Sequence, residues 1–273
     1  MERKLKKFKL SPIIGWILAI AWMFPFYLMI VNSLKTKKEI FTNTLGTPEN
    51  LTFENYPNAY ESLDFAKTFF NSLVITVCSV VLIVVLSSLA AYALQRVKSK
   101  LSGVLFMLFV AAMLIPFQSV MIPLVTIFGK IDQLNMGGLI FMYIGFGSSM
   151  SIFLYHGSMK SIPKSLDEAA IIDGASRWQI FRYVIFPMLK PTTVTVALLN
   201  TMWIWNDYLL PSLVVNKEGS QTIPLKMFFF FGEYTKQWHL ALAGLVIAII
   251  PVIIFYFFMQ KQIIAGVSDG AVK

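Results

Sequence analysis

Two short segments of this 273-residue chain combine residue types that could do chemistry. The first segment, TMWIWNDYLLP, contains Trp203, Trp205, Asn206, Asp207 and Tyr208. Aromatic rings offer flat apolar contact to the C–H faces of sugars, and amide or carboxylate groups offer directional hydrogen bonds to hydroxyls. The pattern is compatible with contact to a carbohydrate and also with an aromatic belt at a membrane interface.

The second segment, SLDEAAIIDGAS, is a compact charged stretch between long apolar runs. Ser165 followed three residues later by Glu168 matches a capping box, and Gly174 stands where a left-handed helix stop belongs. Ser176 predicts the start of a second helix, which Pro187 ends or bends. We therefore expect two short helices joined by a hinge.

The surface of the first of these helices suits a docking role. Asp167 and Glu168 lie in its first turn, where the helix dipole favours acidic residues. The small Ala169 and Ala170 leave a low surface onto which a groove of another protein could close. An amphipathic helix lying on the membrane surface fits the same length, so the residues alone leave both interpretations open.

Composition indicates a membrane protein. The chain is 57% hydrophobic and only 14% charged, against about 25% charged in an ordinary soluble domain. Cys78 is the single cysteine, so no disulfide can form within the chain. His156 and His239 lie far apart in the sequence and predict no metal cluster.

A helix needs about 20 mostly apolar residues to cross a bilayer, and six stretches of the chain meet that requirement. They are residues 11–31, 69–94, 101–125, 137–159, 191–213 and 240–260. We expect an all-α membrane protein, one transmembrane domain over residues 1–273, with the short charged helix between spans four and five. Pro116 and Pro123 fall inside the third span, where they serve either bundle packing or a hinged pathway.

The net charge of +9 is explained by topology. With both termini in the cytoplasm, 15 of the 23 Lys and Arg residues fall on the cytoplasmic side of the six spans. This distribution follows the positive-inside rule. It removes nucleic acid as an explanation for the basic excess, and it places the charged segment after span four on the cytoplasmic face.

Ionisable residues within the expected spans are nearly absent. Only His156 and Asp207 qualify, and both lie toward a span end, whereas ion-coupled carriers commonly bury acids, bases or His relays along their pathway. His156 is interpreted as an interfacial residue rather than a relay. Gln118 and Asn200 are polar residues within spans, and they either line a pathway or hydrogen-bond within the bundle.

The second segment also resembles a family motif. EAAIIDG, nine residues and VIFP together resemble the EAA motif of binding-protein-dependent ABC importer permeases, which reads Glu-Ala-Ala, three residues, Gly, nine residues, Ile, any residue, Leu, Pro. The matching positions are Glu168, Ala169, Ala170, Gly174 and Pro187, while Val184 and Phe186 replace Ile and Leu with other apolar residues. The extended form SIPKSLDEAAIIDGAS, which includes Asp173, is similar to that of carbohydrate-uptake permeases of the maltose-transporter type.

The resemblance covers nearly the whole chain, because NSLK, FFNSLVIT, AAYAL, WNDYLLP and GAVK resemble landmarks of the second six-span permease subunit. It implies a heterodimer with a homologous permease in the bacterial cytoplasmic membrane, two cytoplasmic ATPase subunits, an extracytoplasmic solute-binding protein and a carbohydrate substrate. It further implies that the EAA segment is a coupling helix that docks into a cleft of an ATPase.

The chain lacks a phosphate-binding loop of the Gly-x-x-x-x-Gly-Lys-Ser/Thr type, since Gly129-Lys130 is followed by Ile131. The resemblance thus implies a permease without catalytic residues or a cofactor of its own, with ATP and magnesium held by partner subunits. The rival hypothesis is a self-sufficient, ion-coupled sugar carrier, which needs a coupling site within the membrane. The sequence does not identify the sugar.

Overall fold

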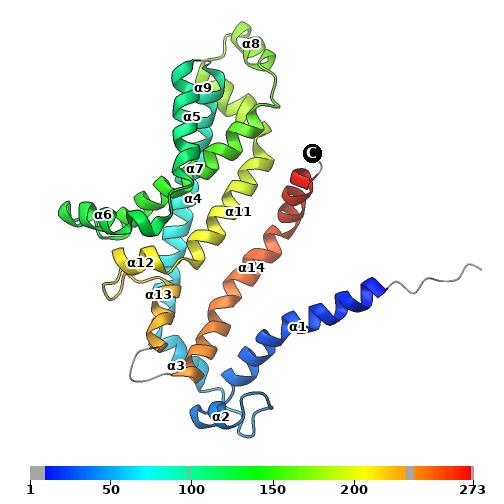
Figure 1. The fold of residues 1–273 in the computed structure, drawn as a ribbon, viewed down its shortest axis with the longest axis vertical. Coiled ribbons are helices and arrows are strands. Elements are labelled where there is room, and N and C mark those ends of the chain that lie inside the picture. The colour runs from blue at the N-terminus through cyan, green and yellow to red at the C-terminus, as the bar shows by residue number, and fades with distance from the viewer. Residues whose placement is uncertain (1–9, 98, 232–236, 272–273) are drawn as a thin grey trace, which may run out of the picture. The chain divides into compact units, whose positions relative to one another are not determined.

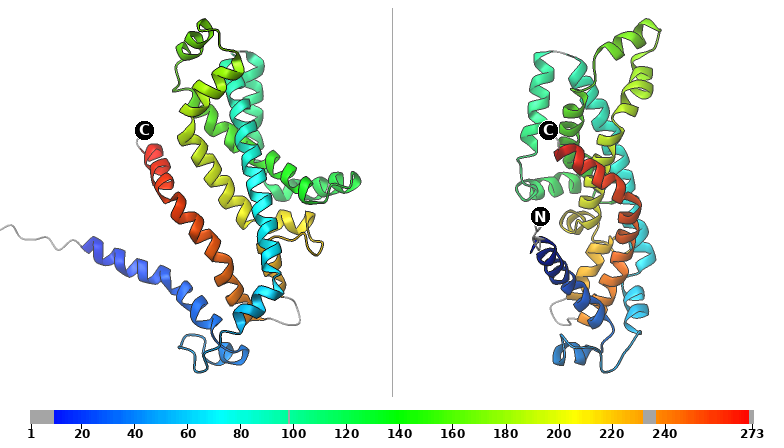
Figure 2. Two further views of the ribbon diagram at one scale, coloured as in Figure 1. Left: turned by 180° about the vertical axis from the view of Figure 1, so that it is seen from behind. Right: turned by 90° about the vertical axis from the view of Figure 1, so that its right-hand side faces the viewer.

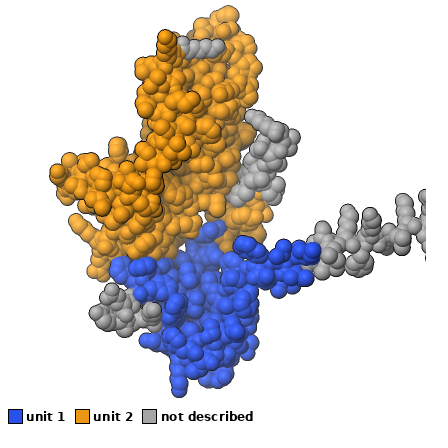
Figure 3. All heavy atoms as spheres, in the orientation of Figure 1, with its two compact units in different colours: residues 1–65, 227–252 blue, residues 66–226, 253–273 orange. Residues whose placement is uncertain are grey.

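The computed structural model describes residues 10–97, 99–231 and 237–271, and it places them in helices joined by turns and loops (Figure 1). No strand occurs in these ranges, so the expected all-α fold is confirmed. The chain divides into two compact units, which are described separately (Figure 3). Unit 1 comprises residues 1–65 and 227–252, and unit 2 comprises residues 66–226 and 253–273.

Unit 1 contains α1 (Leu10–Ser33), α2 (Lys37–Thr42), α3 (Asn55–Ser62), η2 (Phe229–Phe231) and the first half of α14 (Trp238–Ala271). The turn after α1 is organised by Lys35, which is fully buried. Its Nζ donates hydrogen bonds to Asn32 Oδ1 and to the backbone oxygens of Asn43 and Gly46. A buried ammonium group with these acceptors fixes the loop between α2 and α3 against the end of α1.

The centre of unit 2 is a bundle of four helices that run side by side in Figures 1 and 2: α4 (Phe65–Arg96), α5 (Lys100–Ala112), α7 (Met136–Met159) and α11 (Lys190–Asn206). Helix α7 is in the middle, because it packs against both α5 and α11. Its Leu139, Tyr143 and Tyr155 are fully buried. This bundle is the scaffold on which the candidate site residues are mounted.

Shorter helices connect and extend the bundle. They are α6 (Phe117–Lys130), α8 (Ser165–Ile172), α9 (Arg177–Gln179), the π-helix η1 (Ile180–Ile185), α10 (Phe186–Met188), α12 (Leu209–Val214) and α13 (Ile223–Phe228).

Among the described residues, four helices are individually long and apolar enough to cross a membrane, namely α1, α4, α7 and α14. Two bent helix pairs raise the number to six if each pair is one broken span. The expectation of six spans is therefore met only if the bent pairs over residues 100–130 and 177–206 each count as one span.

The third expected span, residues 101–125, is not one straight helix. Helices α5 and α6 meet at an angle of 101° across Met113–Pro116. Pro116 adopts an extended backbone with ψ of 139° and has no N–H to continue the preceding helix, so the chain turns there. Pro123 stays inside α6, where the helix continues through it. Prolines at two positions of the same run thus have different effects.

The fifth expected span, residues 191–213, ends earlier than predicted. Helix α11 stops at Asn206, Asp207 is extended with ψ of 130°, and α12 restarts at Leu209. The Asp207 carboxylate oxygen Oδ1 accepts a hydrogen bond from the Leu209 N–H at 3.0 Å. This side-chain acceptor satisfies a backbone donor at the break, which allows the helix to be interrupted there.

Close contact between α7 and α11 depends on a missing side chain at Gly147. A Cβ atom at this position would lie 2.6 Å from Asn200 Oδ1 and 2.6 Å from Ile83 Cδ1. Asn200 is held in place because its Nδ2 donates to Ser151 Oγ at 3.1 Å and to the Val196 oxygen at 2.8 Å. Small residues that permit such approach are typical of helix contacts within membranes.

We expect Gly147→Ala to lower the free energy of unfolding by about 1–3 kcal/mol, because the added methyl group must displace buried neighbours. Gly145→Ala is the matched control on the same helix, since nothing lies within 4 Å of its Cβ position. Alanine favours the helix by up to about 1 kcal/mol over glycine at both positions, so their difference isolates packing. Thermal unfolding of the purified protein in detergent measures both variants. Equal stability of the two would contradict the close contact.

Candidate functional site

Helix α8 contains most of the EAA-like segment, and its start differs from the prediction. Its N-cap is Lys164, which already has helical dihedrals and makes no side-chain capping bond. The prediction of a capping box at Ser165 and Glu168 is therefore wrong, because Ser165 is already the first residue of the helix. The capping box is found at the next helix, where Ser176 and Gln179 exchange both bonds. The predicted helix start at Ser176 is confirmed.

The predicted left-handed stop at Gly174 is confirmed, with φ of +83°. The Ala175 N–H donates to the Ala170 oxygen at 2.9 Å, and the Gly174 N–H donates to the Ile171 oxygen at 3.0 Å. These two bonds form a Schellman motif, which satisfies the last carbonyl groups of α8. Glycine is favoured here because other residues are strained at this dihedral. The chain thus turns sharply after Asp173.

The outward surface of α8 mixes acidic and apolar groups. Glu168, Ala169 and Asp173 are exposed, whereas Ala170 is half-buried and packs against the hydrophobic core. Ile172 is 86% exposed although it is a large apolar residue. Figure 1 places α8 at one end of unit 2, beyond the ends of α5 and α7. A short helix with exposed apolar and acidic groups at the end of a bundle is a surface suited to a protein partner.

Of the two outcomes predicted at Pro187, an end or a bend of the second helix, the structure shows a bend that follows two residues later. Helices α9, η1 and α10 form one helical run from Arg177 to Met188, which then bends by 76° into α11. The π-helical residues Ile180–Ile185 end two positions before Pro187, and wide turns of this kind are rare. Pro187 lacks an N–H, so the preceding turn cannot complete the ordinary hydrogen-bond pattern. The side chain of Pro187 is exposed.

Sequence reasoning missed the partners of Asp167. This carboxylate is the buried residue of α8, and it pairs with Arg96, the last residue of α4. Tyr92 OH donates to Asp167 Oδ1 at 3.0 Å. Arg96 closes the landmark AAYAL in the sequence, but spacing alone gives no sign that it meets a residue 71 positions later.

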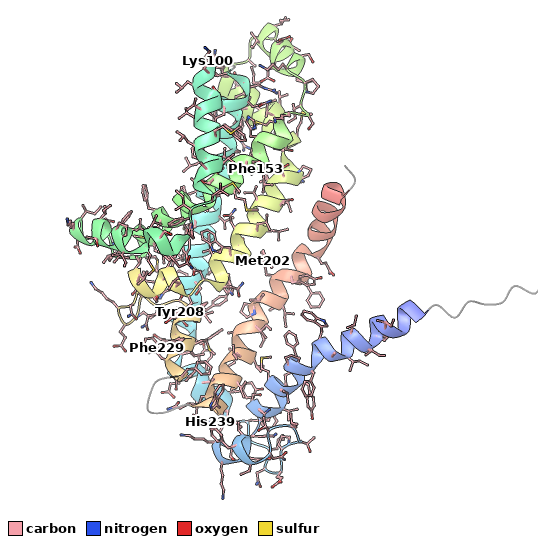
Figure 4. All side chains as sticks on the ribbon, viewed as in Figure 1. Lys100, Phe153, Met202, Tyr208, Phe229 and His239 are labelled. Atoms are coloured by element: carbon pink, nitrogen blue, oxygen red, sulfur yellow. The ribbon has the colours of Figure 1, made fainter. Side chains whose placement is uncertain are left out.

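The aromatic segment forms a second cluster, around the break between α11 and α12, where Figure 4 labels Tyr208. Asp207 Oδ2 accepts a hydrogen bond from Tyr143 OH at 2.9 Å, and the Tyr143 side chain is fully buried. Trp203 packs edge-on against the Tyr143 ring with centroids 5.4 Å apart, and 42% of Trp203 is exposed. The structure therefore brings Trp203 and Asp207 together through Tyr143, which the sequence did not single out.

The other predicted path residues are dispersed. Trp205 packs edge-on against Phe69 with centroids 5.9 Å apart, so it faces α4. Asn206 is exposed, and its side chain donates to the Met202 oxygen. Asn200 is buried and hydrogen-bonds within the bundle, whereas Gln118 is exposed in the first turn of α6.

Neither of these two clusters of described residues gathers three potential metal ligands. Within the ranges that the structure describes, no group of three or more His, Cys, Asp or Glu residues is placed to hold a metal ion. His156 stacks on Phe106 of α5 with ring centroids 3.9 Å apart. The structure shows a short helix with exposed acidic and apolar groups at one end of unit 2 and an aromatic–carboxylate cluster at a helix break.

Comparison with known proteins gives one family. Residues 83–269 match the family described as binding-protein-dependent transport system inner membrane component. The probable starch degradation products transport system permease protein AmyC of Thermoanaerobacterium thermosulfurigenes is 57% identical over 260 residues, which cover 95% of each chain. The melibiose/raffinose/stachyose import permease protein MelC of Bacillus subtilis (strain 168) is 35% identical and covers 98% of each chain.

A solved structure extends the similarity to the fold. It is a bacterial ABC transporter involved in the import of the acidic polysaccharide alginate. One of its chains superposes with a TM-score of 0.78 and 25% identity, and the match covers 92% of this chain and 94% of that chain.

We expect Gly174→Val to loosen the end of α8, because a left-handed conformation costs a residue with a Cβ about 1–2 kcal/mol. The amide hydrogens of residues 170–175 should exchange faster by about 5–30-fold, which hydrogen–deuterium exchange of the purified protein measures. Gly157→Val is the control, since Gly157 also has nothing within 4 Å of its Cβ position but lies in α7 without a positive φ. Unchanged exchange in Gly174→Val would contradict the Schellman geometry.

Proposed function

This chain belongs to the family of binding-protein-dependent transport system inner membrane components, and from that membership we propose that it is a permease subunit of a bacterial ABC importer for a carbohydrate. The observation that carries the proposal is 57% identity across 95% of both chains to a relative named for starch degradation products. Such products and the sugars named for the second relative are oligosaccharides. An oligosaccharide is accordingly the proposed substrate.

The proposed assembly contains four kinds of subunit. This chain would pair with a homologous second permease as a heterodimer in the cytoplasmic membrane, and two cytoplasmic ATPase subunits would bind ATP and magnesium. An extracytoplasmic solute-binding protein would deliver the sugar. The sequence around Gly129 does not match the loop that binds ATP phosphates. This supports the proposal that partner subunits, and not this chain, bind ATP.

The proposed contact with the ATPase is α8. Its exposed Glu168, Ala169 and Asp173 lie on an outward surface, and Gly174 ends the helix so that the chain returns to the bundle. Ala170 packs inward. Pro187 lies where the returning helix approaches its 76° bend into α11. These residues form an anchored joint between a partner and the spans, as the EAA motif implies.

The proposed substrate contacts lie at the break between α11 and α12. Trp203 offers an exposed ring face, and Asp207 and Asn206 offer oxygen and nitrogen atoms for sugar hydroxyls. Trp205, Tyr208, Asn200 and Gln118 complete the candidates that the sequence suggested. Asn200 contributes indirectly, since its amide already bonds to Ser151 and Val196.

The proposed orientation places both termini in the cytoplasm. The basic residues of the N-terminal tail and of the connections after spans two and four then lie on the inner side, as the positive-inside rule requires. Helix α8 faces the ATPase in this orientation. The same arrangement places the break at Asp207 in the outer half of the protein.

Uptake by purified components tests the proposal. Proteoliposomes containing this chain with its partner permease and ATPase, together with the binding protein, should accumulate labelled maltooligosaccharides only when ATP is supplied. An ion gradient alone should drive none. Accumulation by this chain alone under an ion gradient would instead establish the rival carrier. Uptake of a non-carbohydrate alone would refute the substrate class.

We expect Trp203→Ala to raise the half-saturating sugar concentration in this assay by about 2–13-fold, because an aromatic contact contributes about 0.5–1.5 kcal/mol. Trp22→Ala is the control, since Trp22 is 77% exposed on α1 and far along the chain from the cluster. Thermal unfolding of both variants separates folding from recognition. If the half-saturating sugar concentration is unchanged in Trp203→Ala, the ring serves packing or an aromatic belt at the membrane interface and not sugar binding.

A further inference from the structure

Asp167 and Arg96 form an ion pair that joins α8 to the end of α4. Arg96 Nη2 lies 2.8 Å from Asp167 Oδ2, and Arg96 Nε donates to Asp167 Oδ1 at 3.1 Å. The two side chains are only 12% and 13% exposed. Two-point contact between a guanidinium and a carboxylate fixes orientation as well as distance. Asp167 therefore differs from its neighbour Glu168, whose side chain is exposed.

Further hydrogen bonds tie the same helix end to the segment before α8. Both terminal nitrogens of Arg96 donate to the Ile162 oxygen, at 3.3 and 3.4 Å. In return, Lys164 Nζ donates to the Arg96 backbone oxygen at 3.3 Å. Tyr92, one turn earlier on α4, donates to Asp167 Oδ1. The last turn of α4 thus holds the entry and the first turn of α8.

The covalent connections of α8 do not fix its direction in the same way. The chain enters through the turn at Lys160–Pro163 and leaves through Gly174, which has nothing within 4 Å of its Cβ position. After that glycine, Phe181 packs against Tyr92 with ring centroids 5.4 Å apart. Contacts to α4 therefore lie on both sides of the hinge at Gly174. Without the Asp167 pair, the first turn of α8 would lose its ionic contact with α4.

We infer that Asp167 is a positioning residue of the coupling helix: its pair with Arg96 makes α8 move together with α4, so that a displacement of α8 reaches the spans. The inference rests on the proposed function, in which α8 receives that displacement from an ATPase. Glu168 and the exposed residues of α8 contact the partner, whereas Asp167 acts through Arg96. Loss of the pair leaves ATP hydrolysis in place and disconnects it from transport.

The test measures sugar imported per ATP hydrolysed in the reconstituted complex, for Asp167→Asn, Arg96→Gln and the double variant. Each single variant should lower this ratio at least about tenfold, because removing one partner leaves the other charge unpaired in a mostly buried site. The double variant should be no worse than either single variant, since the pair is already broken. Asp167→Glu, which keeps the charge, should recover part of the ratio.

Asp132→Asn is the matched control, because the same chemical change is made at an exposed carboxylate between α6 and α7. Its ratio should equal that of the unsubstituted chain. If Asp167→Asn prevents assembly of the complex, Tyr92→Phe tests the inference in its place. This substitution removes one hydrogen bond to Asp167 and keeps the aromatic ring. It should also lower the ratio of sugar imported per ATP hydrolysed.

Two results would overturn the inference: an unchanged ratio of sugar imported per ATP hydrolysed in Asp167→Asn, or losses that multiply in the double variant. An unchanged ratio in which transport and hydrolysis both fall would assign the pair to folding alone. A failure of the unsubstituted complex to import any sugar would count against the proposed function itself, which separates the two hypotheses.

Discussion

The structure depends on one constraint, that backbone polar groups in hydrocarbon must be hydrogen-bonded within the protein. Long helices meet it without help from side chains, and an interruption needs a substitute acceptor or donor. At the end of α11, Asp207 supplies one, since its carboxylate accepts the Leu209 N–H and is itself held by Tyr143. The polar groups of the aromatic cluster therefore lie where the helix is broken. Asp207 stabilises the break, because its carboxylate accepts a hydrogen bond from a backbone N–H that the helix leaves without a partner.

The same constraint explains the importance of α4. Its 32 residues extend over about 48 Å at 1.5 Å per residue, which exceeds the hydrocarbon thickness of about 30 Å. The helix can thus carry polar anchors at its two ends. Near its start, Asn71 donates to the backbone oxygens of Gly219 and Gln221, and at its last residue Arg96 binds Asp167. One rigid helix holds two loop regions that are distant in the sequence.

A joint between subunits needs one face fixed to its own bundle and another face free for the partner. Helix α8 has both, because Asp167 and Ala170 face inward while Glu168 and Ile172 are exposed. The Schellman turn at Gly174 lets the chain return to the bundle immediately after this short helix. In the proposed function, neighbouring residues of one motif have different tasks: the exposed residues contact the partner, and Asp167 transmits movement to α4.

The sequence by itself determined the all-α fold, the approximate positions of the spans, the left-handed turn at Gly174 and the family. These follow from local properties: apolar run length, the dihedral preference of glycine and a motif of fixed spacing. Only the tertiary structure decided that Pro116 breaks its helix while Pro123 does not, that α11 ends at Asn206, and which side chains meet Asp167 and Asp207. Arg96 and Tyr143 lie 71 and 64 positions from their partners. Such pairs arise from helix packing, which no local pattern in one sequence records.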